Sequence, residues 1–155
     1  MAEYKRGIEA GILAGLIEGI IAGILFYALY QFLFTDMIAA AQADAVSHGY
    51  SGPALQAYMS TWVGNASLIM LVIQFIGAVV WGVIIGSIYA NAYKPVAGGS
   101  IVKGIILGFI FWILVLIPSF SYVTAILYDI ISMLLGVFLF GVLIGFFWDK
   151  LGGKK

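Results

Sequence analysis

Three acidic side chains lie inside apolar stretches of this sequence, where ionisable groups are rare. Glu9 is close to the start of the first stretch, Glu18 follows it nine residues later, and Asp129 is near the beginning of the last stretch. At a helical rise of 1.5 Å per residue, Glu18 would lie about 16 Å deep, near the middle of a membrane. Ionisable residues at that depth commonly mark proton or ion pathways.

Neither Glu18 nor Asp129 has a cationic partner at its own depth, because no Lys, Arg or His occupies the interior of an apolar stretch. Burial without a counter-charge favours the neutral acid. Two roles follow for these carboxylates: they carry a proton or cation, or they meet a cation of another subunit. The structural alternative is a protonated acid that bonds to a hydroxyl or backbone group of a neighbouring helix.

Other residue types that do chemistry are scarce. The absence of cysteine excludes thiolate nucleophiles, disulfides and iron–sulfur ligation. The single histidine, His48, excludes multi-histidine metal or haem ligation within the chain. A serine–histidine pair stays open, although Asp36, Asp44 and His48 follow no recognisable catalytic spacing. We therefore expect no enzyme, no metal site and no cofactor.

Glycine recurs at every fourth residue of the first apolar stretch, which contains GIEAGILAGLIEGIIAG. Small residues let helix backbones approach closely in a bilayer, where van der Waals contact drives association. Shorter glycine pairs recur in the other stretches. The positions expected to pack helices are Gly7, Gly11, Gly15, Gly19, Gly23, Gly82, Gly86, Gly104, Gly108, Gly141 and Gly145.

The first five of these glycines form a ladder, which is longer than one helix crossing requires. We expect the ladder to serve both the packing of this chain and contact with another chain. Glu18 flanks the ladder on the helix surface, so it is expected to border the tight contact and not to face lipid.

The helices that carry these residues are predicted to span a membrane. Hydrophobic residues make up 64% and charged residues 9% of the 155 positions, whereas a water-soluble domain has about 25% charged residues. Four apolar stretches approach the roughly 20 residues that cross a bilayer. The predicted spans are 7–34, 67–90, 101–117 and 123–148. Their continuous hydrophobicity argues against a transmembrane barrel.

All basic residues fall on one side of this four-span arrangement. Such asymmetry predicts that both termini are cytoplasmic, in a multi-pass protein of the plasma membrane. The net charge is zero and the basic residues are scattered, so nucleic acid is not an expected partner. The seven basic residues are Lys5, Arg6, Lys94, Lys103, Lys150, Lys154 and Lys155.

We expect an all-α fold in one integral-membrane domain, 1–155, with the four transmembrane helices arranged as two hairpins. Residues 35–66 are predicted to form a helical hairpin on the outer side. Strong helix formers in MIAAAQADAV extend the first helix to about Val46, and SHGYSG is typical of a turn. Pro53 suits the first turn of a second helix that would end near Tyr93.

The two halves of the chain share short motifs, which predict a parallel internal duplication. Arg6-Gly7-Ile8 resembles Lys103-Gly104-Ile105 at the start of each half, and GVIIG (82–86) resembles GVLIG (141–145) near each end. Both halves would enter the membrane from the same side. Residues 35–66 are then an insertion in the first half.

Two functions from different classes fit these features. The favoured one is a small, non-catalytic structural or accessory subunit of a larger membrane assembly, or a homo-oligomer, whose glycine-rich helix faces pack against its partners. The alternative is a proton- or cation-coupled transporter or channel that uses Glu18 and Asp129. The bilayer is a partner in both.

The alternative invites comparison with two transporter families, which the chain resembles in architecture only. Small multidrug-resistance transporters also have four helices and a glutamate in the first. Duplicated rotary-ATPase proteolipids also combine four Gly-rich helices with a carboxylate in the fourth. This chain is longer and more strongly oriented than the former, and it lacks the alternating-glycine motif of the latter. The resemblance therefore stops at architecture.

Overall fold

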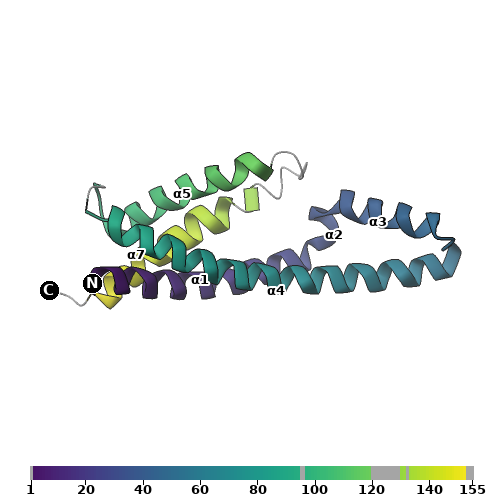
Figure 1. Ribbon diagram of the computed structural model, residues 1–155, viewed down its shortest axis with the longest axis horizontal. Coiled ribbons are helices and arrows are strands. Elements are labelled where there is room, and N and C mark those ends of the chain that lie inside the picture. Colours follow the sequence, from purple (N-terminus) through teal and green to yellow (C-terminus); the bar gives the residue numbers. More distant parts are fainter. Residues whose placement is uncertain (1, 95–96, 120–129, 132, 153–155) are drawn as a thin grey trace.

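The computed structural model describes residues 2–94, 97–119, 130–131 and 133–152, and these residues are all-helical without a strand. Helices and turns follow one another along an elongated molecule, with both termini at one end (Figure 1). In chain order the helices are α1 (Ala2–Ala28), α2 (Tyr30–Leu33), α3 (Thr35–Ser47), α4 (Gly52–Ala92), α5 (Ser100–Ser119), the π-helix η1 (Leu134–Leu139) and α7 (Phe140–Leu151).

Among the described residues, three stretches are long and apolar enough to cross a membrane: Glu3–Ala28, Gly52–Ala92 and Leu134–Leu151. The expected span 101–117 lies in α5, which is not one of these three. The beginning of the expected span 123–148 lies outside the described residues. A chain with several apolar, membrane-compatible helices is therefore established, whereas the number of four spans stays a prediction.

The backbones of α1 and α4 touch directly along the glycine ladder. A Cβ atom added at Gly11 would meet the carbonyl oxygen of Gly82, and one added at Gly82 would meet that of Gly11. At the other end of the ladder, a Cβ at Gly23 would stand 3.2 Å from the carbonyl oxygen of Leu71. The ladder glycines 7, 11, 15, 19 and 23 face, in that order, Gly86, Gly82, Ala78, Phe75 and Leu71.

A second glycine crossing joins α5 to α7. A Cβ at Gly104 would meet the carbonyl oxygen of Gly141, and one at Gly145 would stand 2.5 Å from the Cα atom of Ile101. By contrast, Gly64 and Gly77 of α4, outside the expected set, have open space where a Cβ would stand.

The two crossings differ in register. In the first, Gly7 opposes Gly86. The duplicated motifs would then pair Gly104 with Gly145, but Gly104 opposes Gly141 instead, four residues or one helical turn away. Both halves have a crossing in which glycine contacts glycine, but the glycines that face each other differ by one helical turn between the halves.

The helices after the first crossing depart from the expected continuous helix to Val46. That prediction is wrong, because the helix breaks at Leu29 and again at Phe34, where ψ is 37°. Neither break has a proline or glycine. Tyr30, Leu33 and Phe34 are instead buried in one cluster, so side-chain packing redirects the chain here against its local helix propensity.

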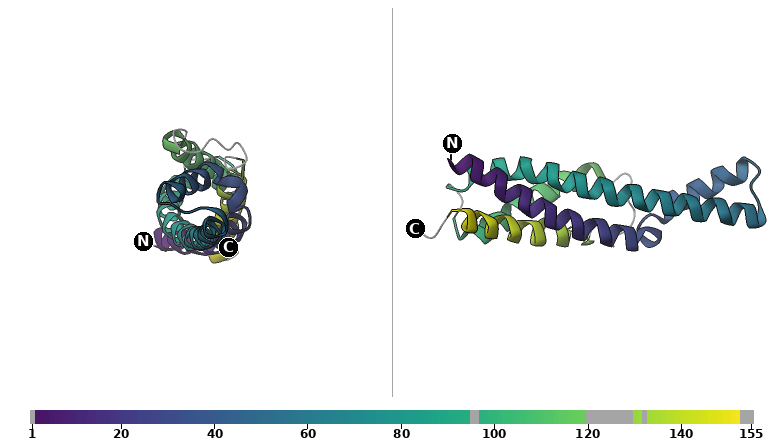
Figure 2. Two further views of the ribbon diagram at one scale, coloured as in Figure 1. Left: turned by 90° about the vertical axis from the view of Figure 1, so that its right-hand side faces the viewer. Right: turned by 90° about the horizontal axis from the view of Figure 1, so that it is seen from below.

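The far end of the molecule is a helix–turn–helix that we call the distal hairpin, made of α3 and residues 52–67 of α4 (Figures 1 and 2). The turn at 48–51 contains Gly49 with φ of +90°, a conformation that favours glycine. α4 begins at Gly52 and ends at Ala92, one residue from each expected bound. Apart from Ala45, the residues of α3 are at least partly exposed.

The core consists of two clusters of buried side chains, one towards each end. The cluster near the termini joins α1, α4, α5 and α7, and includes Tyr89, Ile144 and Trp148. The other joins the end of α1 and α2 to Leu135 of η1, with Trp62 and Val63 of α4 against it. α1 therefore packs between α4 and α7 (Figure 2), whereas α5 makes most of its contacts with α7 and few with α4.

Candidate functional site

Glu18 lies on a stripe of α1 residues four apart, beside the glycine ladder. Ala10, Ala14 and Ala22 of this stripe are at most 1% exposed, whereas Glu18 between them is half-buried. One residue corresponds to about 100° around a helix, so a ladder that faces α4 turns this stripe towards another neighbour.

That neighbour is the last helix. Ala14 shares the cluster near the termini with Phe140, while Ala22 shares the other cluster with Leu135. The two helices therefore run antiparallel, and Glu18 lies at the level of η1, between the two clusters. It thus lies beside the ladder, at a level between the two apolar clusters.

η1 is a π-helical turn, which sequence analysis did not predict. The backbone N–H of Phe140 bonds to the carbonyl oxygen of Leu135, five residues back, instead of four. Such a turn inserts one residue into an α-helix and often occurs at functional sites. Val137, in the middle of the turn, is 2% exposed.

The Glu18 carboxylate makes no hydrogen bond or ion pair with another residue of the described part of the chain. Asp129, the second candidate acid, lies outside the described residues, so the structure does not place it relative to Glu18. The candidate site in the described residues is therefore one carboxylate at the level of a π-helical turn.

A polar and aromatic cluster lies at the end of the molecule that carries both termini. Arg6 Nε donates a hydrogen bond to the carbonyl oxygen of Trp148 over 2.5 Å, and the guanidinium carbon stands 4.3 Å from the Trp148 ring centroid. The guanidinium also occupies the space beside Gly152 that a side chain would fill. The Trp148 carbonyl in the last turn of α7 therefore accepts from both Gly152 N–H and Arg6, and the guanidinium places a cation at the negative end of the helix.

Lys103 of α5 contacts the end of α4 in the way that Arg6 contacts the end of α7. Its Nζ donates to the carbonyl oxygen of Tyr93 over 2.5 Å and lies 3.8 Å from the centroid of that ring. Tyr93 is the C-terminal cap of α4. Each half of the chain therefore begins with a cation that caps the closing helix of the other half.

Ser100, at the start of α5, connects the two caps. Its hydroxyl donates to Asp149 Oδ1 over 2.5 Å, and its carbonyl accepts from the Tyr89 hydroxyl over 2.6 Å. The Tyr89 and Trp148 rings meet edge to face at 5.2 Å. The cluster thus joins residues of α1, α4, α5 and α7.

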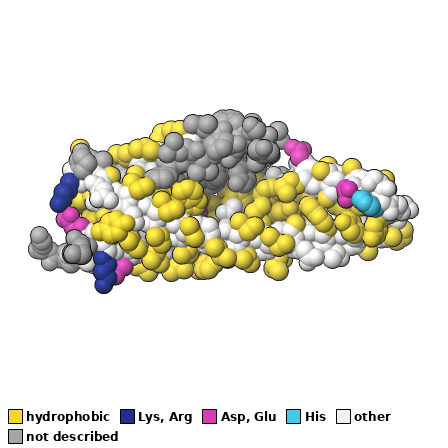
Figure 3. Space-filling view, viewed as in Figure 1, with side chains coloured by type: hydrophobic (Ala, Val, Ile, Leu, Met, Phe, Trp, Pro, Cys, Tyr) yellow, Lys and Arg dark blue, Asp and Glu magenta, His cyan; other side chains and the backbone are white. Residues whose placement is uncertain are grey.

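From the sequence, Arg6 and Lys103 entered the predicted membrane orientation and the duplicated motifs, but not a cluster of this kind. One signal was available: both cations directly precede the first glycine of their half, and aromatic residues follow the last glycine pair of each half. Figure 3 shows the basic side chains on its visible face gathered at this end, with acidic residues among them.

A cleft opens at the base of the distal hairpin, between α3 and α4. Its volume is about 520 Å³, and the end of α1 and α2 close it on one side. Tyr30, Gln31, Gln42 and Gly64 are among its lining residues. None of these was singled out from the sequence.

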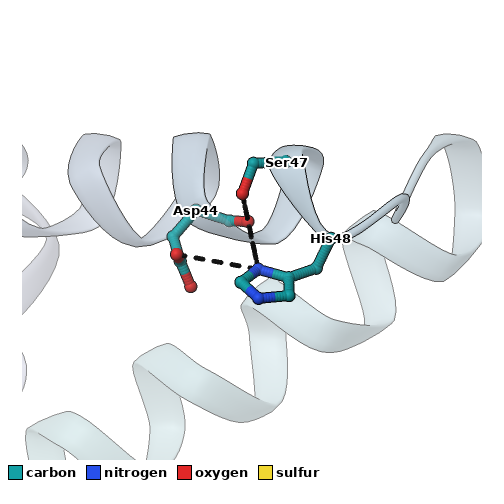
Figure 4. Close-up of polar contacts among 3 residues, drawn as sticks. All are labelled: Asp44, Ser47 and His48. Atoms are coloured by element: carbon teal, nitrogen blue, oxygen red, sulfur yellow. Dashed lines mark hydrogen bonds and ion pairs between the residues drawn. The ribbon is translucent and has the colours of Figure 1, made fainter.

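The turn of the distal hairpin brings Asp44, Ser47 and His48 together, but not as a catalytic triad (Figure 4). The Ser47 hydroxyl lies 3.4 Å from His48 Nδ1, and Asp44 Oδ1 lies 3.7 Å from the same nitrogen. In a triad the carboxylate and the nucleophile contact opposite ring nitrogens. The Ser47 hydroxyl instead donates to the Asp44 carbonyl oxygen over 2.7 Å, which is a local cap at the end of α3.

The chain matches no protein family, no curated protein and no solved structure.

The reciprocal caps predict that Arg6 stabilises the fold more than its neighbour Lys5. Arg6→Gln removes a charged hydrogen bond and a cation–π contact, and should lower the unfolding free energy in detergent micelles by about 1–3 kcal/mol. Lys5 pairs with Glu9 at 3.7 Å with its side chain 80% exposed, so Lys5→Gln should cost less than about 0.5 kcal/mol. Equal unfolding midpoints for the two variants would contradict the assignment.

Proposed function

We propose that the chain is a non-catalytic structural subunit of a larger membrane protein assembly. The observation that carries this proposal is the exposure of apolar side chains on the distal hairpin. Met37 is 50% exposed, Val46 52% and Tyr50 41%. Lipid cannot cover apolar side chains that project beyond the bilayer, and a contiguous patch of such side chains would mark a contact site for a protein.

The length of α4 supports this position of the distal hairpin. Its 41 residues extend about 62 Å at 1.5 Å per residue, roughly twice the thickness of the hydrocarbon core. With the basic residues of the terminal end in the cytoplasm of the cell, in the orientation that the positive-inside rule favours, the distal hairpin stands on the outer side of the plasma membrane.

The position of the glycine ladder bears on which surface of the chain a partner protein could contact. Because α4 of the same chain covers all five ladder positions, a partner has to bind elsewhere. The distal hairpin offers such a surface, and its partner is another membrane subunit or a second copy of this chain.

Co-purification from the native membrane in mild detergent tests this proposal. The wild-type chain should elute as a complex, and Met37→Ser/Val46→Ser should release its partner by removing apolar contacts from the hairpin. Ile69→Ser is the matched control, because Ile69 is 59% exposed on α4 beyond the hairpin. Elution of the wild-type chain as a folded monomer would count against an accessory subunit.

A second candidate function, proton- or cation-coupled transport, is favoured by one observation. Glu18 is a half-buried carboxylate beside the π-helical turn η1, and no described residue bonds to it. A carboxylate that is not held by a neighbour is able to exchange a proton or cation with a passing solvent or substrate.

Flux into liposomes distinguishes this candidate from a purely structural role. Glu18→Gln should abolish proton or cation flux, because the amide neither releases a proton nor neutralises a cation. Glu9→Gln is the control, since Glu9 lies on the same helix and pairs with exposed Lys5. Wild-type flux that persists in Glu18→Gln would exclude the carrier role.

A further inference from the structure

We propose that the cleft at the base of the distal hairpin binds an uncharged, lipid-like amphiphile, whose hydroxyl or carbonyl head bonds to Tyr30, Gln31 and Gln42. This site is separate from the exposed apolar side chains assigned to a protein partner. It does not depend on the chain being a subunit of an assembly.

The cleft has the size and the walls of a ligand site. Its volume of about 520 Å³ lies in the range of roughly 300–1,000 Å³ that small-molecule sites occupy. Ile38 of α3 and Met59 and Val63 of α4 supply apolar walls. Gly64 leaves room between them, since a Cβ added there would meet nothing within 4 Å.

Tyr30 is the strongest indication of a ligand. The residue is only 2% exposed, and its ring stacks on Phe34 with centroids 4.8 Å apart. It lines the cleft, yet its hydroxyl makes no hydrogen bond with another described residue. Since no fully buried side-chain oxygen or nitrogen of the described residues lacks a partner, the Tyr30 hydroxyl keeps accessible area in the cleft. An oxygen atom of a bound molecule can reach it there.

The polar groups around Tyr30 select an uncharged head. Among the described residues, no Asp, Glu, Lys, Arg or His lines the cleft, so they offer an ionic head no counter-charge. Ser60 and Ser67 already donate to the carbonyl oxygens of Ala57 and Gly64 in their own helix. The amides of Gln31 and Gln42 remain, and an amide both donates to a carbonyl and accepts from a hydroxyl.

The position of the cleft favours an amphiphile over a water-soluble molecule. The predicted spans 7–34 and 67–90 have their outer ends near this cleft, because Tyr27, Tyr30, Gln31 and Ser67 line it. The cleft therefore lies at the level where a bilayer gives way to water. At that level, a lipid presents its head to Tyr30 and keeps its apolar body among the walls and the adjoining lipid.

Photolabelling of the full-length chain in phosphatidylcholine nanodiscs tests the site. The probe is a diacylglycerol with a photoreactive acyl chain, and a phosphatidylglycerol with the same chain is the charged comparison. The diacylglycerol probe should label cleft peptides of α3 and α4 preferentially, and excess unlabelled dioleoylglycerol should suppress this labelling. Equal labelling of the cleft by the charged probe, or equal labelling of the cleft and the rest of α4, would overturn the proposal.

Three variants locate the binding determinants. Gly64→Leu fills the cleft and should reduce its labelling at least 10-fold, whereas Gly77→Leu adds the same side chain to open space elsewhere on α4 and should leave labelling unchanged. Tyr30→Phe keeps the packed ring and should weaken binding about 3- to 10-fold through loss of one hydrogen bond. Undiminished labelling in both Gly64→Leu and Tyr30→Phe would show that the probe binds elsewhere.

Discussion

Direct backbone contact between α1 and α4 is the constraint on which the rest of the structure depends. At Gly11 and Gly82 the Cβ of either residue would meet the carbonyl oxygen of the other. Contact of this kind fixes the rotation of each helix as well as its distance from the other, because a turn of either helix would bring a side chain into the backbone. With the ladder held against α4, the neighbouring stripe of α1 faces α7. Glu18 is consequently placed at the level of η1 by the same contact.

The second pair of helices depends on this arrangement through α1. α7 packs on α1, whereas α5 makes few contacts with α4. The end that carries the termini compensates for this asymmetry with polar contacts. Arg6 caps α7 and Lys103 caps α4, and Ser100 bonds to both Tyr89 and Asp149. Each cap joins the start of one half to the end of the other. These contacts hold the two halves together although their glycine crossings differ in register.

Features that depend on local sequence could be predicted here. Features that depend on contacts between residues distant in sequence could not. Composition indicates an all-helical chain with several apolar helices, and the Pro53 signal lies one residue from the observed start of α4. The breaks at Leu29 and Phe34 could not be predicted, because they result from packing with residues that are distant in sequence, such as Leu135. The π-helical turn has no proline or glycine signal that marks its start. The cleft was equally hidden, because Tyr30, Gln42 and Gly64 meet only after the chain folds back on itself.

The central claim is that the ladder of α1 packs on α4 of its own chain. Because the chain has no cysteine, a disulfide between Gly19→Cys and Ala78→Cys tests it most directly. A Cβ at Gly19 would stand 3.0 Å from the Ala78 Cβ, and a disulfide needs roughly 3.5–4.5 Å, within reach of a small shift. Oxidation in the membrane should give an internally cross-linked monomer on a non-reducing gel, while Gly19→Cys/Gly77→Cys should not cross-link. A cross-linked dimer as the main product of the first pair would contradict the account.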